Sequence, residues 1–77
     1  MKQHTYTFAT YNGRVKICID GVLFLTFNQI DFKGIYAYKD DTNLYGIDIY
    51  LATTTMEVYF KTKQVWLDIL QLLNTKL

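Results

Sequence analysis

The sequence predicts an α+β fold: a curled antiparallel sheet of about six strands in meander order, closed by one C-terminal helix over residues 63–75. Three observations predict it. Apolar and polar residues alternate through most of the chain, turn residues recur at short intervals, and only the final segment has apolar residues at helical spacing. With 77 residues and neither a repeat nor a linker, we expect a single domain over residues 1–77.

Two tight turns organise the first three strands. Asn12-Gly13 and Asp20-Gly21 tolerate positive φ and therefore favour two-residue hairpins. The first turn joins residues 5–11 to residues 14–20, and the second leads into a strand that begins at Val22. A simple register then pairs residues across the two hairpins as Thr10–Val15, Phe8–Ile17, Tyr6–Ile19, Ile19–Val22, Ile17–Phe24 and Val15–Thr26.

Three further strands are predicted over residues 30–39, 44–52 and 55–61. A loop at residues 40–43 and a turn at Thr53-Thr54 separate them. Alternation predicts that their shared apolar face contains Ile30, Phe32, Tyr36, Tyr38, Tyr45, Ile47, Ile49, Leu51, Met56, Val58 and Phe60.

The third strand is apolar on both sides, which brings the two halves into conflict. In the simple register Leu23, Leu25 and Phe27 lie opposite to the side of Ile17, yet they continue the apolar face of the later strands. Either the sheet rolls around the third strand, or a bulge near Asn28 or Gly34 reverses the alternation. Both solutions stay open at this point.

The C-terminal segment carries more apolar surface than one helix face needs. Thr62 is a suitable N-cap, and the stripe that faces the core contains Trp66, Ile69, Leu70, Leu73 and Leu77. Val65, Leu67 and Leu72 fall outside the centre of this stripe. We therefore predict an interface at these three residues, through which the chain forms a homo-oligomer or binds another protein. The alternative is that Val65 and Leu72 cover the rim of a rolled sheet.

Composition argues against several classes of function. The net charge is +1, Arg14 is the single arginine, and the chain has no serine, so neither a strongly basic nucleic-acid footprint nor a serine nucleophile is expected. Cys18 and His4 show no metal-ligand spacing. We expect a protein without enzymatic activity, metal or cofactor.

The lone thiol and the absence of an apolar leader at the start of the sequence predict a cytoplasmic protein. The longest apolar run is Val22-Leu23-Phe24-Leu25, far below the roughly 20 residues of a membrane-spanning helix. Small size and frequent tyrosine, asparagine and lysine also suggest a phage or mobile-element protein that acts on a host partner.

The polar side of the later strands offers two further hypotheses. Asp31, Asp48 and Glu57 suggest paired carboxylates for acid–base chemistry, but the simple register separates them by placing Asp48 opposite Tyr59. The alternative to a protein interface is single-stranded nucleic acid stacked on a sheet face with aromatic and basic residues. Its candidate residues are Tyr50, Tyr59, Lys33, Lys61 and Lys39.

The last forty or so residues, with Tyr59-Phe60-Lys61 before Thr62 and Val65-Trp66-Leu67 after it, resemble the end of pleckstrin-homology-like domains. They are also similar in topology to the small four-stranded coactivator fold that binds single strands. The resemblance implies antiparallel strands followed by a helix and assigns no site residues. We predict a small protein-interaction or assembly module that associates through its C-terminal helix.

Overall fold

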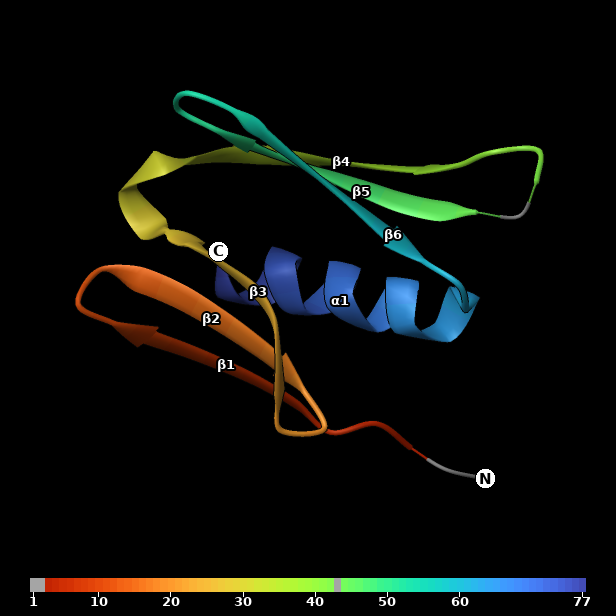
Figure 1. The fold of residues 1–77 in the computed structure, drawn as a ribbon, viewed down its shortest axis with the longest axis horizontal. Coiled ribbons are helices and arrows are strands. Elements are labelled where there is room, and N and C mark those ends of the chain that lie inside the picture. Colours follow the sequence, from red (N-terminus) through yellow and green to blue (C-terminus); the bar gives the residue numbers. More distant parts are fainter. Residues whose placement is uncertain (1–2, 43) are drawn as a thin grey trace. The chain divides into compact units, whose positions relative to one another are not determined.

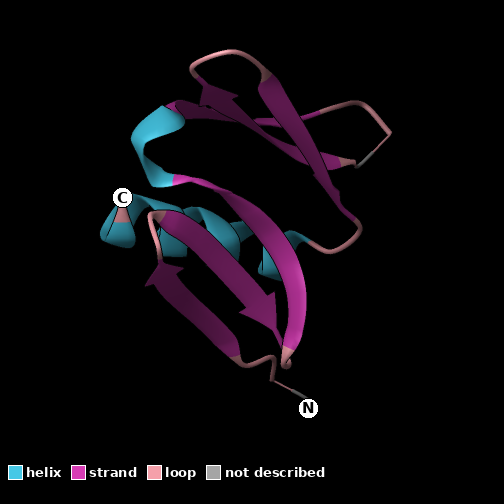
Figure 2. Cartoon of the chain, turned by 60° about the vertical axis from the view of Figure 1, so that its left-hand side comes forward, coloured by secondary structure: helices cyan, strands magenta, loops and turns pink. Residues whose placement is uncertain are grey.

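The computed structural model of the chain describes residues 3–42 and 44–77, with the elements drawn in Figures 1 and 2. Their order is β1 (Tyr6–Tyr11), β2 (Arg14–Ile19), β3 (Val22–Asn28), the 3₁₀ turn η1 (Gln29–Asp31), β4 (Phe32–Lys39), β5 (Tyr45–Leu51), β6 (Thr55–Phe60) and α1 (Lys63–Lys76). The predicted α+β class, six antiparallel strands and C-terminal helix are confirmed.

The strands form two sheets rather than one. The first has the order β1-β2-β3 and the second has the order β4-β5-β6. The chain accordingly divides into two compact units, the first ending at Phe32 and the second beginning at Lys33. The expectation of a single domain over residues 1–77 stays a prediction.

The hairpin of β1 and β2 has the predicted register. Thr10 pairs with Val15, and the pairing continues to Tyr6 and Ile19 at the other end. Asn12 and Gly13 have φ values of 51° and 76°, which a two-residue hairpin with the right-handed strand twist requires. The sequence alone therefore fixed this turn and the faces of both strands.

The hairpin of β2 and β3 corrects the simple register. Cys18 pairs with Leu23 as expected, but Ile17 then pairs with Leu25 instead of Phe24. Phe24 is the extra residue of a β-bulge, which reverses the alternation beyond it. The predicted pairs of Ile17 with Phe24 and of Val15 with Thr26 are therefore wrong.

This bulge also resolves the conflict between the two sides of β3, although not at the predicted place. It lies at Phe24, before the predicted positions Asn28 and Gly34. After it, Leu25 and Phe27 share the buried face of Val15 and Ile17. Burying these two large side chains is the physical reason for the extra residue, because each contributes on the order of 2 kcal/mol when removed from water.

The connection after β3 is the 3₁₀ turn η1, and it leads from the first sheet to β4 of the second. Ile30 is 84% exposed, so its predicted place on the apolar face is wrong. The Gln29 amide donates to the carbonyl of Gly13 at 2.8 Å, and the Phe27 and Phe32 rings stack with centroids 5.9 Å apart. These contacts hold the end of β3 within the first unit.

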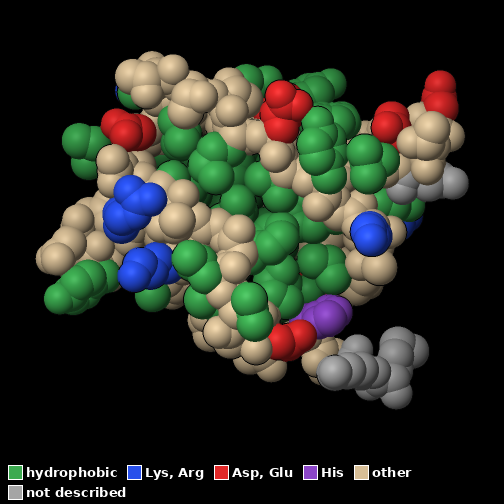
Figure 3. All heavy atoms as spheres, in the orientation of Figure 1, with side chains coloured by type: hydrophobic (Ala, Val, Ile, Leu, Met, Phe, Trp, Pro, Cys, Tyr) green, Lys and Arg blue, Asp and Glu red, His purple; other side chains and the backbone are tan. Residues whose placement is uncertain are grey.

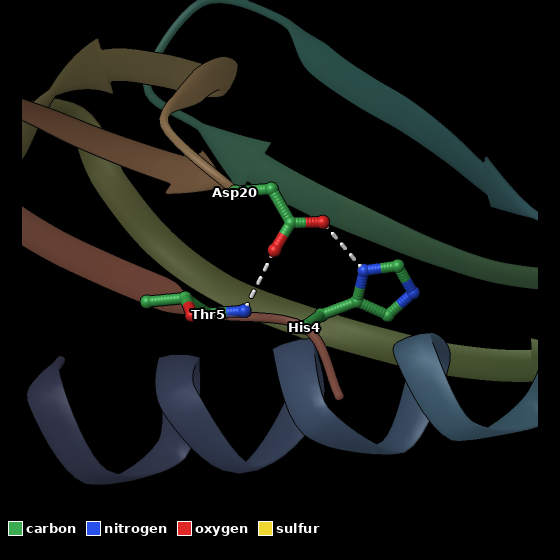
Figure 4. Close-up of polar contacts among 3 residues, drawn as sticks. All are labelled: His4, Thr5 and Asp20. Atoms are coloured by element: carbon green, nitrogen blue, oxygen red, sulfur yellow. Dashed lines mark hydrogen bonds and ion pairs between the residues drawn. The ribbon is translucent and has the colours of Figure 1, made fainter. Parts of the chain in front are cut away.

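The start of β1 is tied to the turn between β2 and β3 (Figure 4). Asp20 Oδ1 accepts a hydrogen bond from the Thr5 amide at 2.8 Å, and its Oδ2 lies 2.7 Å from His4 Nδ1. The Asp20 amide in turn donates to the Thr5 carbonyl at 2.7 Å. One aspartate therefore fixes the backbone of the N-terminal segment beside the turn.

In the second unit, the hairpin of β5 and β6 is shifted by two residues from the predicted register. The Leu51 amide donates to the Thr54 carbonyl at 2.8 Å, so the tight turn is Ala52-Thr53 and not Thr53-Thr54. Asp48 consequently pairs with Glu57, where Tyr59 was expected. A shift of two residues keeps each side chain on its predicted face and changes only its neighbours.

The hairpin of β4 and β5 differs by one residue, which has a larger effect. The Asp40 amide donates to the Leu44 carbonyl at 3.1 Å, so the loop is one residue shorter than predicted. A shift of one residue reverses every side chain of β4. Tyr38 consequently lies over Gly46, on the opposite side from Ile47 and Ile49, and the predicted apolar position of Tyr36 and Tyr38 is wrong.

Helix α1 begins and ends within one residue of the predicted range and contacts β5 and β6. Ile69 and Leu73 are buried together with Ile47, Ile49 and Phe60 of the sheet, which forms the core of the second unit. Thr62 occupies the N-cap position, but its side chain makes no capping hydrogen bond. None of the helices in residues 3–42 and 44–77 has the length and apolar character needed to cross a membrane.

Candidate functional site

One face of the second sheet is covered by exposed aromatic side chains. We call it the tyrosine face, and it consists of Tyr36, Tyr38, Gly46, Asp48, Tyr50, Glu57 and Tyr59. Tyr36, Tyr50 and Tyr59 are 58%, 40% and 49% exposed. Figure 3, which colours tyrosine with the hydrophobic residues, shows an acidic side chain beside green ones in the region of these strands.

Backbone geometry positions the tyrosines. Gly46 has no side chain, and Tyr38 occupies the space above it, since a Cβ on Gly46 would fall 2.7 Å from Tyr38 Oη. Tyr36 stacks on Tyr38 with centroids 6.1 Å apart and an angle of 25° between the rings. Tyr59 lies directly across from Gly46 in the ladder, so it flanks Tyr38 from the next strand but one. Tyr38 therefore lies over Gly46, with Tyr36 stacked on it and Tyr59 on the strand at the other side of β5.

Two carboxylates lie among these rings. Asp48 and Glu57 are directly opposite each other on β5 and β6, where Cβ atoms are typically about 5 Å apart. The Tyr59 hydroxyl donates to Glu57 Oε2 at 2.7 Å. This hydrogen bond to Glu57, followed by one with Tyr38, raises the pKa of Tyr59 above its ordinary value of 10.0. Tyr59 therefore remains a neutral hydrogen-bond donor throughout the physiological pH range.

The carboxylate of Asp48 has fewer hydrogen bonds than that of Glu57. Its Oδ1 is shielded from solvent and has no hydrogen-bond partner among the residues that the structure describes. No lysine or arginine among the described residues lies within ion-pair distance of Asp48 or Glu57. The sequence argument that register separates the acidic residues is thus wrong for this pair, because the Ala52-Thr53 turn brings them together.

The structure does not bring the predicted lysines to this face. Lys39 Nζ lies 5.6 Å from the centroid of the Tyr45 ring, and Tyr45 is on the other side of the sheet with Trp66, 5.0 Å away. Lys33 has the same parity as Lys39 on β4, so alternation places it on that other side too. Lys61 is exposed just beyond the end of β6. On the tyrosine face, the neighbours of Tyr50 and Tyr59 are therefore two further tyrosines and two carboxylates, and not the predicted lysines.

The predicted helix interface is partly covered by the chain itself. Val65 and Leu72 are half-buried, whereas Leu67 is 42% exposed. Trp66 is held by a hydrogen bond from its indole Nε1 to the Gly46 carbonyl at 2.9 Å. Leu67, on the next position of the helix, consequently points away from that contact. Of the three predicted interface residues, Leu67 is the one that the chain leaves uncovered.

Tyr36 and Tyr38 are the functional candidates that the sequence argument missed. Both alternating sets of β4 are compatible with an apolar face, because Ile35 and Ala37 compete with Tyr36 and Tyr38. The phenol hydroxyl could have shown which set faces the core. A tyrosine favours a position where its polar end reaches water, whereas the side chain of Ile35 has no polar end. In the structure Ile35 and Ala37 have the parity of the core face.

Outside the tyrosine face, the described residues include one free thiol and no cluster of metal ligands. Cys18 is a free, half-buried thiol on β2. Within residues 3–42 and 44–77, no three histidine, cysteine, aspartate or glutamate side chains lie close enough to hold a metal ion. Comparisons of the chain with protein-family models, with curated proteins and with solved structures find no match. The similarity of the last forty or so residues to two known topologies therefore gains no support from a solved structure.

Proposed function

We propose that the protein is a non-enzymatic protein-binding module that contacts its partner through the tyrosine face. The observation that carries the proposal is the exposure of Tyr36, Tyr50 and Tyr59 on a face held rigid by strand pairing. Tyrosine supplies a large amphipathic contact area with only two side-chain torsions to fix, and for this reason it is enriched in protein interfaces and binding hot spots.

Charge favours a protein over nucleic acid as the partner. The tyrosine face carries Asp48 and Glu57, which repel phosphate, while Lys39 is engaged with Tyr45 on the other side of the sheet. Platforms for single strands combine aromatic rings with a basic groove that follows the backbone. We keep nucleic acid as the alternative outcome of the test below.

Absence of catalysis is part of the same proposal. The chain has no serine, and its cysteine lies in the first unit, away from the second sheet in sequence. Asp48 and Glu57 are on neighbouring strands of a regular ladder and not at a loop or strand end, where catalytic groups are more often positioned. We also propose a cytoplasmic location, because a lone thiol is typical of reducing compartments.

The test is selection of peptides from a display library on the purified protein, followed by affinity measurement on a variant with Tyr36→Ser and Tyr50→Ser. Selected peptides should bind the native protein and lose at least tenfold in affinity on the variant, since each substitution removes a ring from the contact. A variant with Tyr11→Ser, an exposed tyrosine of β1, is the matched control and should bind as the native protein does. Equal binding to all three proteins, or salt-sensitive binding of single-stranded DNA that the double variant abolishes, would contradict the proposal.

Self-association through the helix is the second candidate, because Leu67 is 42% exposed on a helix of which Ile69 and Leu73 are already buried in the core. Light scattering should then show a mass above that of one chain. Leu67→Lys should restore the monomer without loss of the circular-dichroism signal, because Leu67 contributes little to the core. A native protein that scatters as a single chain at high concentration would exclude this candidate.

A further inference from the structure

We propose that the tyrosine face recognises an arginine side chain of its protein partner, with the guanidinium placed between Asp48 and Glu57 and against the surrounding tyrosine rings. This inference rests on the proposed function and names the chemistry of the partner at that site. It is argued from charge, from hydrogen-bond capacity and from the rigidity of the face.

The first argument is the uncompensated charge of the face. Like charges directly opposite each other on neighbouring antiparallel strands destabilise a sheet. Asp48 and Glu57 have this arrangement, and neither forms an ion pair with any residue that the structure describes. The sheet thus tolerates a repulsion in the free protein that a cation supplied by a partner would convert into attraction.

The second argument is the unused hydrogen-bond capacity. Among the described residues Asp48 Oδ1 has no hydrogen-bond partner, but it is shielded from solvent, so a guanidinium would meet the half-buried Asp48 at its other oxygen. Glu57 Oε2 receives one hydrogen bond, from Tyr59. A guanidinium offers five N–H donors in one plane, enough to reach two carboxylates at once, whereas an ammonium group is a compact and strongly hydrated charge. The spacing of two facing carboxylates therefore fits arginine better than lysine.

The aromatic rings provide the third argument. A guanidinium stacks on the face of a tyrosine ring through cation–π attraction, which strengthens when water is excluded. Tyr36, Tyr50 and Tyr59 are exposed around the carboxylates, and Tyr59 is fixed by its hydrogen bond to Glu57. Tyr38 is fixed by Tyr36 and by the space above Gly46. Rings that are already ordered lose little conformational entropy when a partner binds.

The same observations disfavour other cations. A divalent metal takes six or more oxygen ligands, and the described residues provide no group of three metal-binding side chains anywhere. Nucleic acid would bring phosphate to a face whose charges are negative. A protein segment with arginine satisfies both the charge and the aromatic character of the face.

The experiment titrates the ¹⁵N- and ¹³C-labelled protein with N-acetyl-arginine amide and follows the chemical shifts by NMR. N-acetyl-citrulline amide is the control probe, because citrulline has nearly the same shape without the charge. The shifts should change at Tyr36, Tyr50, Tyr59 and Glu57 with arginine and stay unchanged with citrulline. Glu57→Gln should weaken binding of the arginine probe at least fivefold.

Asp41→Asn is the matched control, since it removes one exposed carboxylate from the loop after β4, away from the tyrosine face. It should leave binding at the face unchanged. The inference would be overturned if Asp41→Asn, and not Glu57→Gln, weakened binding of the arginine probe. Equal chemical-shift changes with the arginine and citrulline probes would also overturn it. So would Ca²⁺ binding at micromolar concentration to Asp48 and Glu57.

The peptide selection separates this inference from the proposed function. Peptides that bind the tyrosine face and lose at least tenfold in affinity when their arginine is replaced by citrulline support both. Peptides that need Tyr36 and Tyr50 but contain no arginine support the proposed function and overturn the inference. If the affinity of no selected peptide depends on Tyr36 and Tyr50, the proposed function is wrong. The inference then fails with it, even if the arginine probe binds to the tyrosine face.

Discussion

The ring of Tyr38 lies over the backbone of Gly46, where a Cβ would fall 2.7 Å from Tyr38 Oη. The carbonyl of the same glycine accepts the hydrogen bond from Trp66 Nε1 at 2.9 Å. Gly46 thus joins two aromatic residues, one from β4 and one from α1. The absence of its side chain is what allows the tyrosine face to form.

Gly46→Ala should destabilise the protein by about 1–2 kcal/mol, because the new methyl group collides with the Tyr38 ring and forces it out of position. Urea unfolding followed by circular dichroism measures the change. In a Tyr38→Ala background the same substitution should be neutral or stabilising, since alanine loses less backbone entropy than glycine in a strand.

Gly34→Ala is the matched control for this cycle, because a Cβ at Gly34 meets no atom within 4 Å. We expect it to be neutral or to stabilise by about 0.5 kcal/mol. Equal effects of the alanine at positions 34 and 46 would show that Tyr38 does not lie over Gly46.

Glu57→Gln should lower the pKa of Tyr59 toward 10.0, because the hydrogen bond to the Glu57 carboxylate is the main cause of the rise. A raised pKa means that folding favours the neutral phenol, so this contribution to stability is full below pH 10 and is lost as the pH rises through the folded value. The variant should therefore lose less stability than the native protein between neutral pH and pH 11. NMR titration of Tyr59 ¹³Cζ checks the pKa, and Asp41→Asn should leave it unchanged.

Thr42→Val should raise the pKa of Asp40 toward 3.8. The Thr42 hydroxyl donates to Asp40 Oδ1 at 2.7 Å and is the largest cause of the lowered value, ahead of the Leu44 amide at 3.0 Å. A lowered pKa stabilises the fold above pH 3.8, and this contribution is lost as the pH falls through the folded value. The variant should consequently lose less stability on acidification. ¹³C NMR titration of the Asp40 carboxyl is the measurement, and an unchanged pKa would assign the effect to the Leu44 amide.

Deletion of Phe24 should be tolerated. Phe24 is the extra residue of the bulge, and without it Leu23 and Leu25 would become neighbours of a regular ladder with Leu25 and Phe27 still on the buried face. Deletion of Thr26 should prevent folding or cost several kcal/mol, since it turns either Leu25 or Phe27 out of the buried face. Thermal unfolding of the two deletions side by side is the check. Similar melting temperatures would mean that the bulge is not what sets the alternation of β3.

Much of the fold follows from local chemistry. The hairpin turns at Asn12-Gly13 and Asp20-Gly21 require positive φ, which glycine and asparagine or aspartate tolerate, and the register of β1 with β2 follows from the first of them. Helix α1 follows equally from its apolar spacing and its lack of glycine and proline. These features depend on residues close together in the sequence.

Errors in the predicted strand register explain why the sequence did not reveal the residues of the tyrosine face. One residue in the loop after Lys39 decides whether Tyr36 and Tyr38 or Ile35 and Ala37 face the core, and both sets are apolar enough for either choice. Two residues in the turn after Leu51 decide whether Asp48 lies opposite Glu57 or Tyr59. Neither choice has a local signal, because the flanking residues are compatible with either length of the loop after Lys39 and with either position of the turn after Leu51.

The sequence by itself determined the class of the fold, the two glycine turns, the helix and the exposure of Leu67. Only the tertiary structure decided the division into two sheets, the bulge at Phe24 and the assembly of four tyrosines and two carboxylates on one face. The physical reason is that strand pairing joins residues distant in sequence, and a shift of one position exchanges a strand's two faces at almost no local cost. Burial of the large side chains across the whole sheet selects among these registers.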